Sequence, residues 1–301
     1  MNALFIVGPT AVGKSALALT VARCCGGVIC AMDAFQVYRR LDIGTGKPTV
    51  GEQAAAPHRL INLCDPLDRF SVADYLREAE RALTVIPAGT PRIWTGGTGL
   101  YARALRLGLG AAPASDPELA RQLDALPLTV LQEEIRRLDP AWCATADLQN
   151  PRRIIRALAV ARGTGKPFSE WQRERGKPLL AKANGIFLLP KREEGRSRIA
   201  ARVRQMWAAG WPDEVQSLLT VSGWRESQSA RALGYLTIAD YLDGRLGRSE
   251  CLEKIITQTG QYAKRQVTWF RKEPGFAVAA DGDEALRLAE QWLREGRLPE
   301  S

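Results

Sequence analysis

The 301-residue sequence predicts an α/β protein in which helices flank a parallel sheet, with an all-helical insertion. Two observations predict the sheet: strand and helix signals alternate through residues 1–109, and a glycine-rich loop joins the first strand to the first helix. The insertion is predicted because only helical periodicity is present from about 116 to 175. Ligands of parallel sheets bind at the carboxyl ends of the strands, so segments that follow strand ends should converge.

The expected elements follow in order along the chain. In the first part, strands are expected at 3–7, 28–32, 58–62 and 91–95, and helices at 14–24, 71–86 and 98–107. In the insertion, helices are expected at 116–125, 128–138, 151–163 and 167–174. After it come strands at 185–190 and 276–279 and helices at 191–209, 212–220, 230–242, 248–272 and 283–296. This divides the chain into a core, 1–111 and 184–301, and an insertion, 112–183.

The loop after the first strand has the spacing of a phosphate-binding loop, Gly8-x4-Gly13-Lys14-Ser15. Its glycines let successive N–H groups point at an anion, and the following helix adds its positive dipole end. Lys14 supplies a full charge, and the Ser15 hydroxyl is a hard oxygen ligand for Mg²⁺. The alternative is a turn that only joins strand to helix. We therefore expect a P-loop NTPase-like core that holds a phosphate compound through Gly8, Thr10, Ala11, Val12, Gly13, Lys14 and Ser15.

The composition points to an anionic partner. The net charge of +9 makes nucleic acid the first candidate, although many basic proteins bind nothing anionic. Six cysteines without C-x-x-C spacing and a single histidine, His58, argue against a zinc site and against histidine-based catalysis. No apolar run approaches the ~20 residues of a bilayer span, and the first strand leaves no room for a signal peptide. We expect a cytoplasmic protein without membrane contact.

Basic residues gather in three places. One set follows Pro151 on an insertion helix: Arg152, Arg153, Arg156 and Arg162. A second crowds one helix after the insertion: Lys191, Arg192, Arg196, Arg198, Arg202 and Arg204. A third is interleaved with Tyr262, Trp269 and Phe270: Lys264, Arg265, Arg271 and Lys272. Each set alone could be a solvated helix face. Three sets beside a phosphate loop favour phosphate contacts and stacking on unpaired bases.

Two further segments follow strand ends. Asp33 closes the second strand, where its carboxylate can accept a proton or hold a substrate amine, although an Asp here could also be a helix N-cap. Gln36 could pair with an adenine edge. Gly96-Gly-Thr98-Gly-Leu-Tyr101 is a candidate second backbone cradle. The strand at 91–95 ends without the acid that usually organises Mg²⁺ in P-loop kinases, so Asp33 serves as that acid or the chemistry is not terminal phosphoryl transfer.

Eight motifs together resemble the bacterial tRNA dimethylallyltransferase family from end to end. They are Gly8–Ser15, Asp33-Ala-Phe-Gln-Val-Tyr38, Leu41-Asp-Ile-Gly-Thr-Gly-Lys-Pro48, Pro57-His-Arg-Leu60, Gly96–Tyr101, Pro151-Arg-Arg-Ile-Ile-Arg-Ala-Leu158, Arg231-Ala-Leu-Gly-Tyr235 and Ala263-Lys-Arg-Gln-Val-Thr-Trp-Phe-Arg271. The resemblance implies transfer of a dimethylallyl group from dimethylallyl diphosphate to the 6-amino group of adenosine 37 of tRNA. It also implies Mg²⁺ as cofactor, the anticodon stem-loop as partner and a flipped target base. We expect a monomer.

The resemblance also implies roles for residues. The catalytic group would be Asp33 as general base with Thr98, Lys14 and Arg231, and Ser15 would lie at the Mg²⁺. The tRNA contacts would be Asp33, Ala34, Phe35, Gln36, Thr98, Arg152, Arg153, Arg156, Arg231, Gly234, Tyr235, Lys264 and Arg265.

Three positions depart from the family pattern, and three other functions stay open. Ala34 stands where the family usually has serine, Gly46 where alanine is common, and Asp147-Leu-Gln-Asn150 where His-Pro-Asn-Asp is frequent. None of them removes Asp33 or Lys14, so activity is expected. The alternatives are a small-molecule kinase, a prenyltransferase acting on free adenine nucleotides, and a non-catalytic RNA-binding protein.

Overall fold

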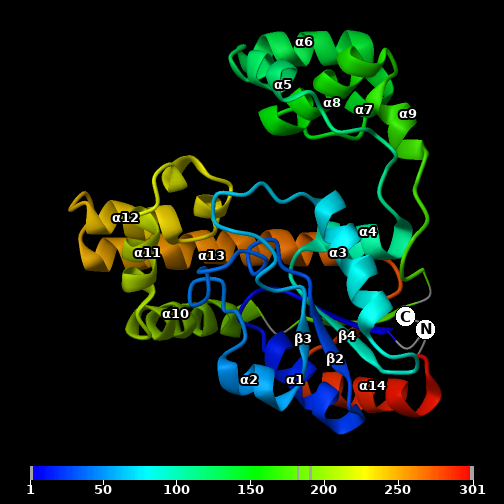
Figure 1. Cartoon of the computed structure of the whole chain (residues 1–301), viewed down its shortest axis with the longest axis vertical. Coiled ribbons are helices and arrows are strands. Elements are labelled where there is room, and N and C mark those ends of the chain that lie inside the picture. The colour runs from blue at the N-terminus through cyan, green and yellow to red at the C-terminus, as the bar shows by residue number, and fades with distance from the viewer. Residues whose placement is uncertain (1–2, 182, 190–191, 299–301) are drawn as a thin grey trace. The chain divides into compact units, whose positions relative to one another are not determined.

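The computed structural model describes residues 3–181, 183–189 and 192–298 and divides into two compact units (Figure 1). Met1–Arg106 and Leu180–Ser301 form the unit that contains the sheet. Leu107–Leu179 form a helical unit. None of the described helices combines the length and hydropathy that crossing a bilayer requires.

The described strands form one parallel sheet in the order β3-β2-β4-β1-β5-β6. The strands are β1 (Ala3–Val7), β2 (Val28–Ala31), β3 (His58–Arg59), β4 (Arg92–Gly96), β5 (Asn184–Leu188) and β6 (Ala277–Ala279). Every residue of β1 is buried, as expected for a strand covered on both faces. The predicted α/β class with a parallel sheet is confirmed.

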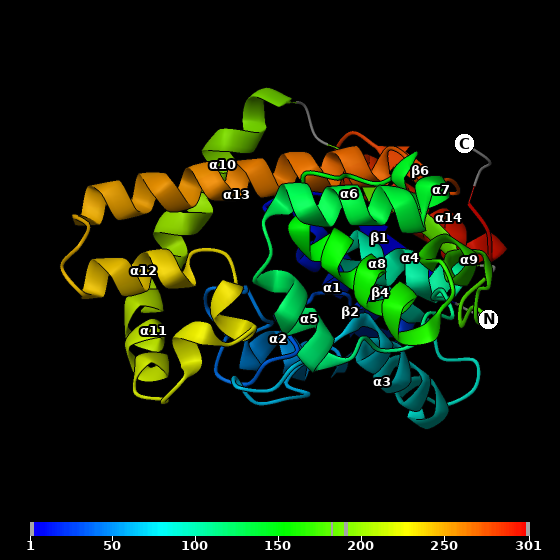
Figure 2. The same ribbon diagram turned by 90° about the horizontal axis from the view of Figure 1, so that it is seen from above.

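Helices cover both faces of this sheet. The α-helices of this unit are, in chain order, α1 (Lys14–Cys25), α2 (Val50–Ala55), α3 (Val72–Val85), α4 (Gly99–Leu107), α10 (Arg192–Ala208), α11 (Trp211–Leu219), α12 (Tyr235–Leu242), α13 (Arg248–Phe270) and α14 (Gly282–Glu295). Leu4 and Ile6 share a hydrophobic cluster with α1 and α14. Ile186 and Leu188 of β5 belong to the same cluster, so Phe187 between them faces the other side, where its ring lies 5.8 Å from that of Phe270 in α13. The long helix α13 also runs beside α10 and α12 (Figure 2).

Backbone geometry explains where the expected elements differ. The third strand was expected to run to 62 but ends at Arg59, because Leu60 and Asn62 adopt left-handed φ values of 67° and 55°. The helix expected at 230–242 is interrupted at Gly234, whose φ is 90°. A short helix, α2, was missed although a Thr49–Glu52 capping box begins it. The last residue of the strand expected at 185–190 and the first residue of the helix expected at 191–209 lie outside the described residues.

The helical unit has its own apolar core. It contains α5 (Pro117–Asp124), α6 (Leu128–Leu138), α7 (Pro140–Cys143), α8 (Pro151–Thr164) and α9 (Phe168–Arg173). Leu131, Trp142 and Ile154 are buried in its centre. The unit begins before the expected 112 because its two connecting segments pair: Gly176 donates to the Leu109 carbonyl at 2.9 Å, and Ala111 donates to the Glu174 carbonyl at 2.7 Å.

Candidate active site

The loop between β1 and α1 is shaped for an anion. Gly8 has a φ of 151°, and a Cβ there would lie 2.6 Å from the Leu188 carbonyl oxygen, so only glycine fits. Ala11 and Gly13 both adopt left-handed φ values, 62° and 95°. Gly13 is the N-cap of α1 and provides no side-chain cap, so the first amides of the helix are available to a ligand. This geometry agrees with the predicted phosphate-binding loop.

Lys14 is held inside this loop. Its ammonium donates to the Pro9 carbonyl at 2.6 Å. Burial and the positive charge of Arg202, partly opposed by the charge of Asp33, together lower the pKa of Lys14 to about 7. An arriving polyanion would stabilise the protonated form, so the charge state of Lys14 depends on whether a ligand is bound.

Asp33 follows β2 on the turn that begins at Met32. Its Oδ1 accepts hydrogen bonds from the Phe35 N–H at 2.8 Å and the Gln36 N–H at 3.3 Å. Burial raises the pKa of Asp33, and these bonds, with the charges of Lys14 and Arg202, oppose the rise. A carboxyl with a raised pKa at a cavity wall is suited to accept a proton near neutral pH.

Thr98 lies where β4 turns into α4 and fixes the segment beside Asp33. Its Oγ1 accepts a hydrogen bond from the Ala34 N–H at 3.2 Å, and its N–H donates to the Met32 carbonyl at 3.3 Å. The second backbone cradle thus contacts the Asp33 turn directly. Ala34 makes this contact through its backbone N–H. The contact therefore does not need the hydroxyl of the serine that the family usually has at this position.

Gln266 and Tyr262, on α13, belong to the site although the sequence did not single them out for it. Gln266 accepts a hydrogen bond from the Thr10 N–H at 2.9 Å and donates one to the Gly97 carbonyl at 3.0 Å. It therefore ties the phosphate loop to the β4–α4 turn. Side-chain hydrogen bonds join Tyr262 to Thr98 and Gln266. The sequence marks this helix only by its mixture of basic and aromatic residues. That mixture does not indicate which side chains of the helix face the sheet.

Arg202, on α10, also lines the site, although the sequence pattern did not predict a role for it there. It was one member of a basic cluster, yet its charge acts on both Lys14 and Asp33. Burial lowers the pKa of Arg202, and Asp33 opposes that shift. A Cβ at Gly46 would lie 2.1 Å from the Arg202 Nη2, so the glycine at this position leaves room for the guanidinium.

Two cavities adjoin Asp33. The larger has a volume of about 520 Å³ and the smaller about 300 Å³. The smaller one is lined by the phosphate loop, from Thr10 to Ser15, and by Gln36. The larger one is lined by Phe35, Arg231, Gly234 and Arg265 among others. Both are lined by the same five residues: Thr10, Asp33, Thr45, Arg202 and Tyr262. Asp33 therefore lines both the cavity beside the glycine-rich loop and a second, larger cavity.

Some predicted contact residues are engaged elsewhere. The Gln36 amide nitrogen donates to the Thr45 and Gly46 carbonyls at 3.2 and 3.1 Å, so in this conformation Gln36 holds a loop and has no free N–H for a base. Tyr235 is fully buried. Arg156, within the helical unit, donates to Ser115 at 2.6 Å and to the Pro113 carbonyl at 2.7 Å.

Other predicted contact residues are accessible. Arg152 and Arg153 on α8 and Lys264 on α13 are exposed to solvent. They are free to meet a large partner. Lys264 does not line either cavity, in contrast to its neighbour Arg265.

The smaller cavity offers hard oxygen donors for Mg²⁺. Ser15 and Asp33 both line it beside the phosphate loop. Mg²⁺ is held in phosphate sites by one or two protein oxygens together with phosphate oxygens and water. Among the described residues no group of three or more His, Cys, Asp or Glu side chains is placed to hold a metal. The donors fit a Mg²⁺ that arrives with a phosphate compound.

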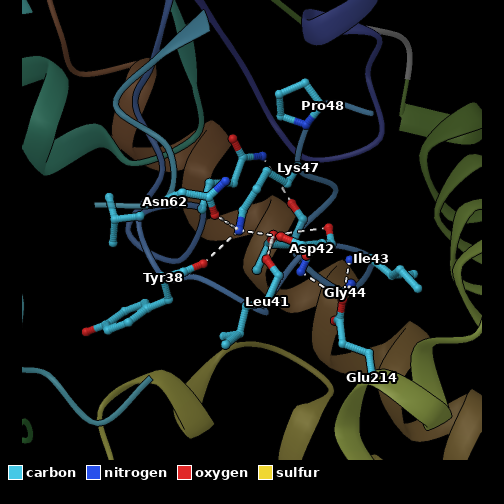
Figure 3. Close-up of polar contacts among 12 residues, drawn as sticks. Tyr38, Leu41, Asp42, Ile43, Gly44, Lys47, Pro48, Asn62 and Glu214 are labelled. Carbon is cyan, nitrogen blue, oxygen red and sulfur yellow. Dashed lines mark hydrogen bonds and ion pairs between the residues drawn. The ribbon is translucent and has the colours of Figure 1, made fainter. Parts of the chain in front are cut away.

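Lys47 anchors the loop that carries Thr45 and is drawn in Figure 3. Its side chain is 2% exposed, and its ammonium donates to the Tyr38 carbonyl at 2.7 Å, to Asn62 Oδ1 at 2.6 Å and to Asp42 Oδ1 at 2.5 Å. All three donors of the ammonium are thus used.

Replacement of Lys47 by methionine is expected to lower the free energy of unfolding by about 3 kcal/mol, because it leaves buried acceptors without a donor. Urea unfolding would measure the loss. Asp42→Asn is the matched comparison and should cost less, because the Asp42 side chain is 59% exposed and water can replace the pair. Equal losses in the two variants would contradict this account.

The fold and this site define a class: an α/β protein with a glycine-rich loop between β1 and α1 and a carboxylate, Asp33, that lines two adjoining cavities. The IPP transferase family matches residues 36–273, and the isopentenyl transferase family matches residues 1–64. The chain therefore belongs to the IPP transferase family. The predicted family resemblance is confirmed.

Individual relatives extend this match over nearly the whole chain. A tRNA dimethylallyltransferase of Halorhodospira halophila is 41% identical over 287 residues, which cover 92% of this chain and 93% of that protein. One of Syntrophobacter fumaroxidans is 40% identical over 279 residues, which cover 91% and 82%. The crystal structure of the full-length tRNA isopentenylpyrophosphate transferase of Bacillus halodurans matches with a TM-score of 0.71 at 33% identity, covering 97% of this chain and 95% of that one.

Proposed function

We propose that this enzyme transfers a dimethylallyl group from dimethylallyl diphosphate to the 6-amino group of adenosine 37, next to the anticodon of tRNA. The observation that carries the proposal is the position of Asp33, whose carboxyl lines both the phosphate cavity and the larger cavity. An amine in the larger cavity and an allylic carbon attached to a diphosphate in the smaller one would meet at Asp33. The names of the relatives support the donor and the acceptor.

The reaction forms a bond from the adenine nitrogen to the allylic carbon and breaks the bond from that carbon to diphosphate. The adenine amine is a weak nucleophile because its lone pair is delocalised into the ring. Asp33 accepts a hydrogen bond from it and takes its proton as the new bond forms. Lys14, the amides at the start of α1 and the nearby Arg202 stabilise the growing charge on the diphosphate. When bound at Ser15, Mg²⁺ would add positive charge at the phosphate oxygens.

The tRNA requires a wider basic surface than the cavities supply. Arg231 and Arg265 line the larger cavity, and Arg152 and Arg153 are exposed on α8 of the helical unit. These arginines suit backbone phosphates, which supply most of the affinity for nucleic acid. The proposal includes a monomeric enzyme, located in the cytoplasm where tRNA is modified.

The direct test is incubation with Mg²⁺, dimethylallyl diphosphate and unmodified tRNA whose anticodon is followed by adenosine. We expect mass spectrometry of the digested tRNA to show one dimethylallyl adduct, on that adenosine. AMP as acceptor and ATP hydrolysis serve as comparisons. Product on AMP alone, or ATP turnover without prenyl transfer, would refute the proposal.

Lys14 is expected to take up a proton when dimethylallyl diphosphate binds at about pH 8. Burial has lowered its pKa to about 7, so above that pH the empty site holds mostly neutral lysine. The diphosphate favours the charged form and raises the pKa again. Affinity should therefore fall as the pH rises above 7, by up to about tenfold per unit.

Calorimetry in two buffers with different ionisation enthalpies would measure this proton uptake. Lys14→Arg is the control, because a guanidinium stays charged throughout this range. Uptake of the same size in the arginine variant would assign the proton to another group.

Replacement of Arg153 by alanine is expected to weaken tRNA binding and to reduce the slope of log K against log salt by about one, as for loss of one phosphate contact. Filter binding at several salt concentrations would measure both. Arg287→Ala is the matched control: this exposed arginine lies on α14, which contributes no residue to either cavity. An unchanged slope for Arg153→Ala would show that this arginine does not contact phosphate.

A further inference from the structure

Glu214, on α11, binds the loop Leu41–Lys47 through its carboxylate. Its Oε2 accepts hydrogen bonds from the Asp42 N–H at 2.8 Å and the Ile43 N–H at 2.7 Å (Figure 3). Its Oε1 accepts one from the Gly44 N–H at 3.2 Å. Three successive backbone N–H groups thus converge on one anion, an arrangement that stabilises a carboxylate strongly.

The same carboxylate also holds α12. Its Oε1 accepts a hydrogen bond from the Tyr235 hydroxyl at 2.7 Å. Burial and the neighbouring charge of Glu214 raise the pKa of Tyr235, so its hydroxyl keeps the proton that it donates. Glu214 therefore connects the loop that carries Gly44 to the helix that begins after Gly234, and Gly44 and Gly234 both line the larger cavity.

Trp211 sets the spacing of these two segments. It lies one helical turn before Glu214, on the same side of α11. A Cβ at Gly44 would lie 2.0 Å from the Trp211 Nε1, and a Cβ at Gly234 would lie 2.4 Å from its ring. The indole is buried between the two glycine backbones and also lines the larger cavity. The first turns of α11 thus determine the distance between two walls of that cavity.

Hydrogen bonds connect the loop Leu41–Lys47 to Asp33. Thr45, next to Gly44, lines both cavities, and its carbonyl accepts a hydrogen bond from the Gln36 side chain. Gln36 in turn donates its N–H to Asp33 Oδ1. Gly44, which Glu214 holds directly, lines the larger cavity and not the smaller one, and the phosphate loop has separate support from Gln266, so a shift of Gly44 acts first on the larger cavity.

We propose that Glu214 is a positioning residue for the tRNA acceptor, which holds the loop Leu41–Lys47 and Tyr235 at the separation that admits the target base. The proposal rests on the proposed function for the identity of the acceptor. If the proposal holds, loss of the Glu214 carboxylate weakens the binding of tRNA and leaves the binding of dimethylallyl diphosphate nearly unchanged.

Glu214→Gln keeps the size of the side chain but replaces one acceptor oxygen by an NH2 group that faces N–H donors. We expect the KM for tRNA to rise roughly tenfold, as for loss of one charge-assisted hydrogen bond. The KM for dimethylallyl diphosphate should stay within about twofold. Asp213→Asn is the matched control, because it removes an exposed acid from the same helical turn and changes the helix dipole interaction equally.

Hydrogen exchange of the peptide covering residues 41–47 is the second readout and needs no substrate. Its amides should exchange faster in Glu214→Gln than in wild type or in Asp213→Asn. Unchanged exchange, an unchanged KM for tRNA, or a parallel rise of both KM values would overturn the proposal. If the wild type transferred no dimethylallyl group to tRNA, the proposed function and the acceptor role would both fall, while the exchange result would still report whether Glu214 holds the loop.

Discussion

Replacement of Asp33 by asparagine is expected to lower kcat for dimethylallyl transfer roughly 10³-fold, the usual range for loss of a general base. Asparagine still presents an oxygen to the Phe35 and Gln36 N–H groups, so the turn after β2 keeps its hydrogen bonds. The amide cannot take a proton from the adenine amine. The loss should therefore appear in the chemical step, with the affinity for tRNA within a few-fold of wild type.

The stability of this variant provides the control. Burial raises the pKa of Asp33 in the folded protein, so its ionised form opposes folding at neutral pH. Asparagine removes this cost, and the variant is expected to unfold at the same or a higher temperature. Single-turnover transfer, tRNA binding and thermal unfolding would be measured together. Turnover within tenfold of wild type would remove Asp33 from its role as base.

Replacement of Arg202 by alanine is expected to lower kcat about 10²-fold, comparable to loss of one group that stabilises developing charge. The guanidinium lines both cavities and lies close enough to Asp33 and Lys14 to shift both pKa values. Its removal therefore takes positive charge away from the leaving diphosphate and from the base.

The second effect has a sign that can be measured. Arg202 lowers the pKa of Asp33, so the alanine variant should have a higher pKa for this carboxyl, and the acid limb of the kcat/KM profile should move to higher pH. Arg204→Ala is the matched control, since Arg204 is exposed on the same helix and lines neither cavity. A slow Arg202 variant with an unshifted acid limb would contradict the coupling to Asp33.

Much of the site could be predicted because it follows local rules. The spacing of Gly8, Gly13, Lys14 and Ser15 marks a phosphate loop wherever a strand precedes it and a helix follows it. Asp33 and Thr98 lie directly after the carboxyl ends of β2 and β4, and parallel strands bring those ends to one edge of the sheet. Each of these residues is therefore placed by its own segment.

The rest could not be predicted because it depends on helix orientation over long sequence separations. Arg202 and Gln266 reach the site from α10 and α13, and nothing in a basic helix shows which residue turns inward. Arg156 shares a face with Arg153 in the sequence pattern, yet it bonds to Ser115 and Pro113. Tyr235, a predicted tRNA contact, is buried and donates its hydroxyl to Glu214, a partner that the sequence pattern does not show.

The sequence by itself determined the parallel α/β core, the glycine-rich loop after β1, the place of Asp33 after β2 and the helical segment between β4 and β5, because periodicity, glycine spacing and strand ends are properties of short segments. Only the tertiary structure decided which cations face Asp33, which polar groups brace the loops, and that Asp33 borders both cavities. Burial and packing across distant segments set these features, since a side chain acquires its partners and its pKa only when the chain has folded around it.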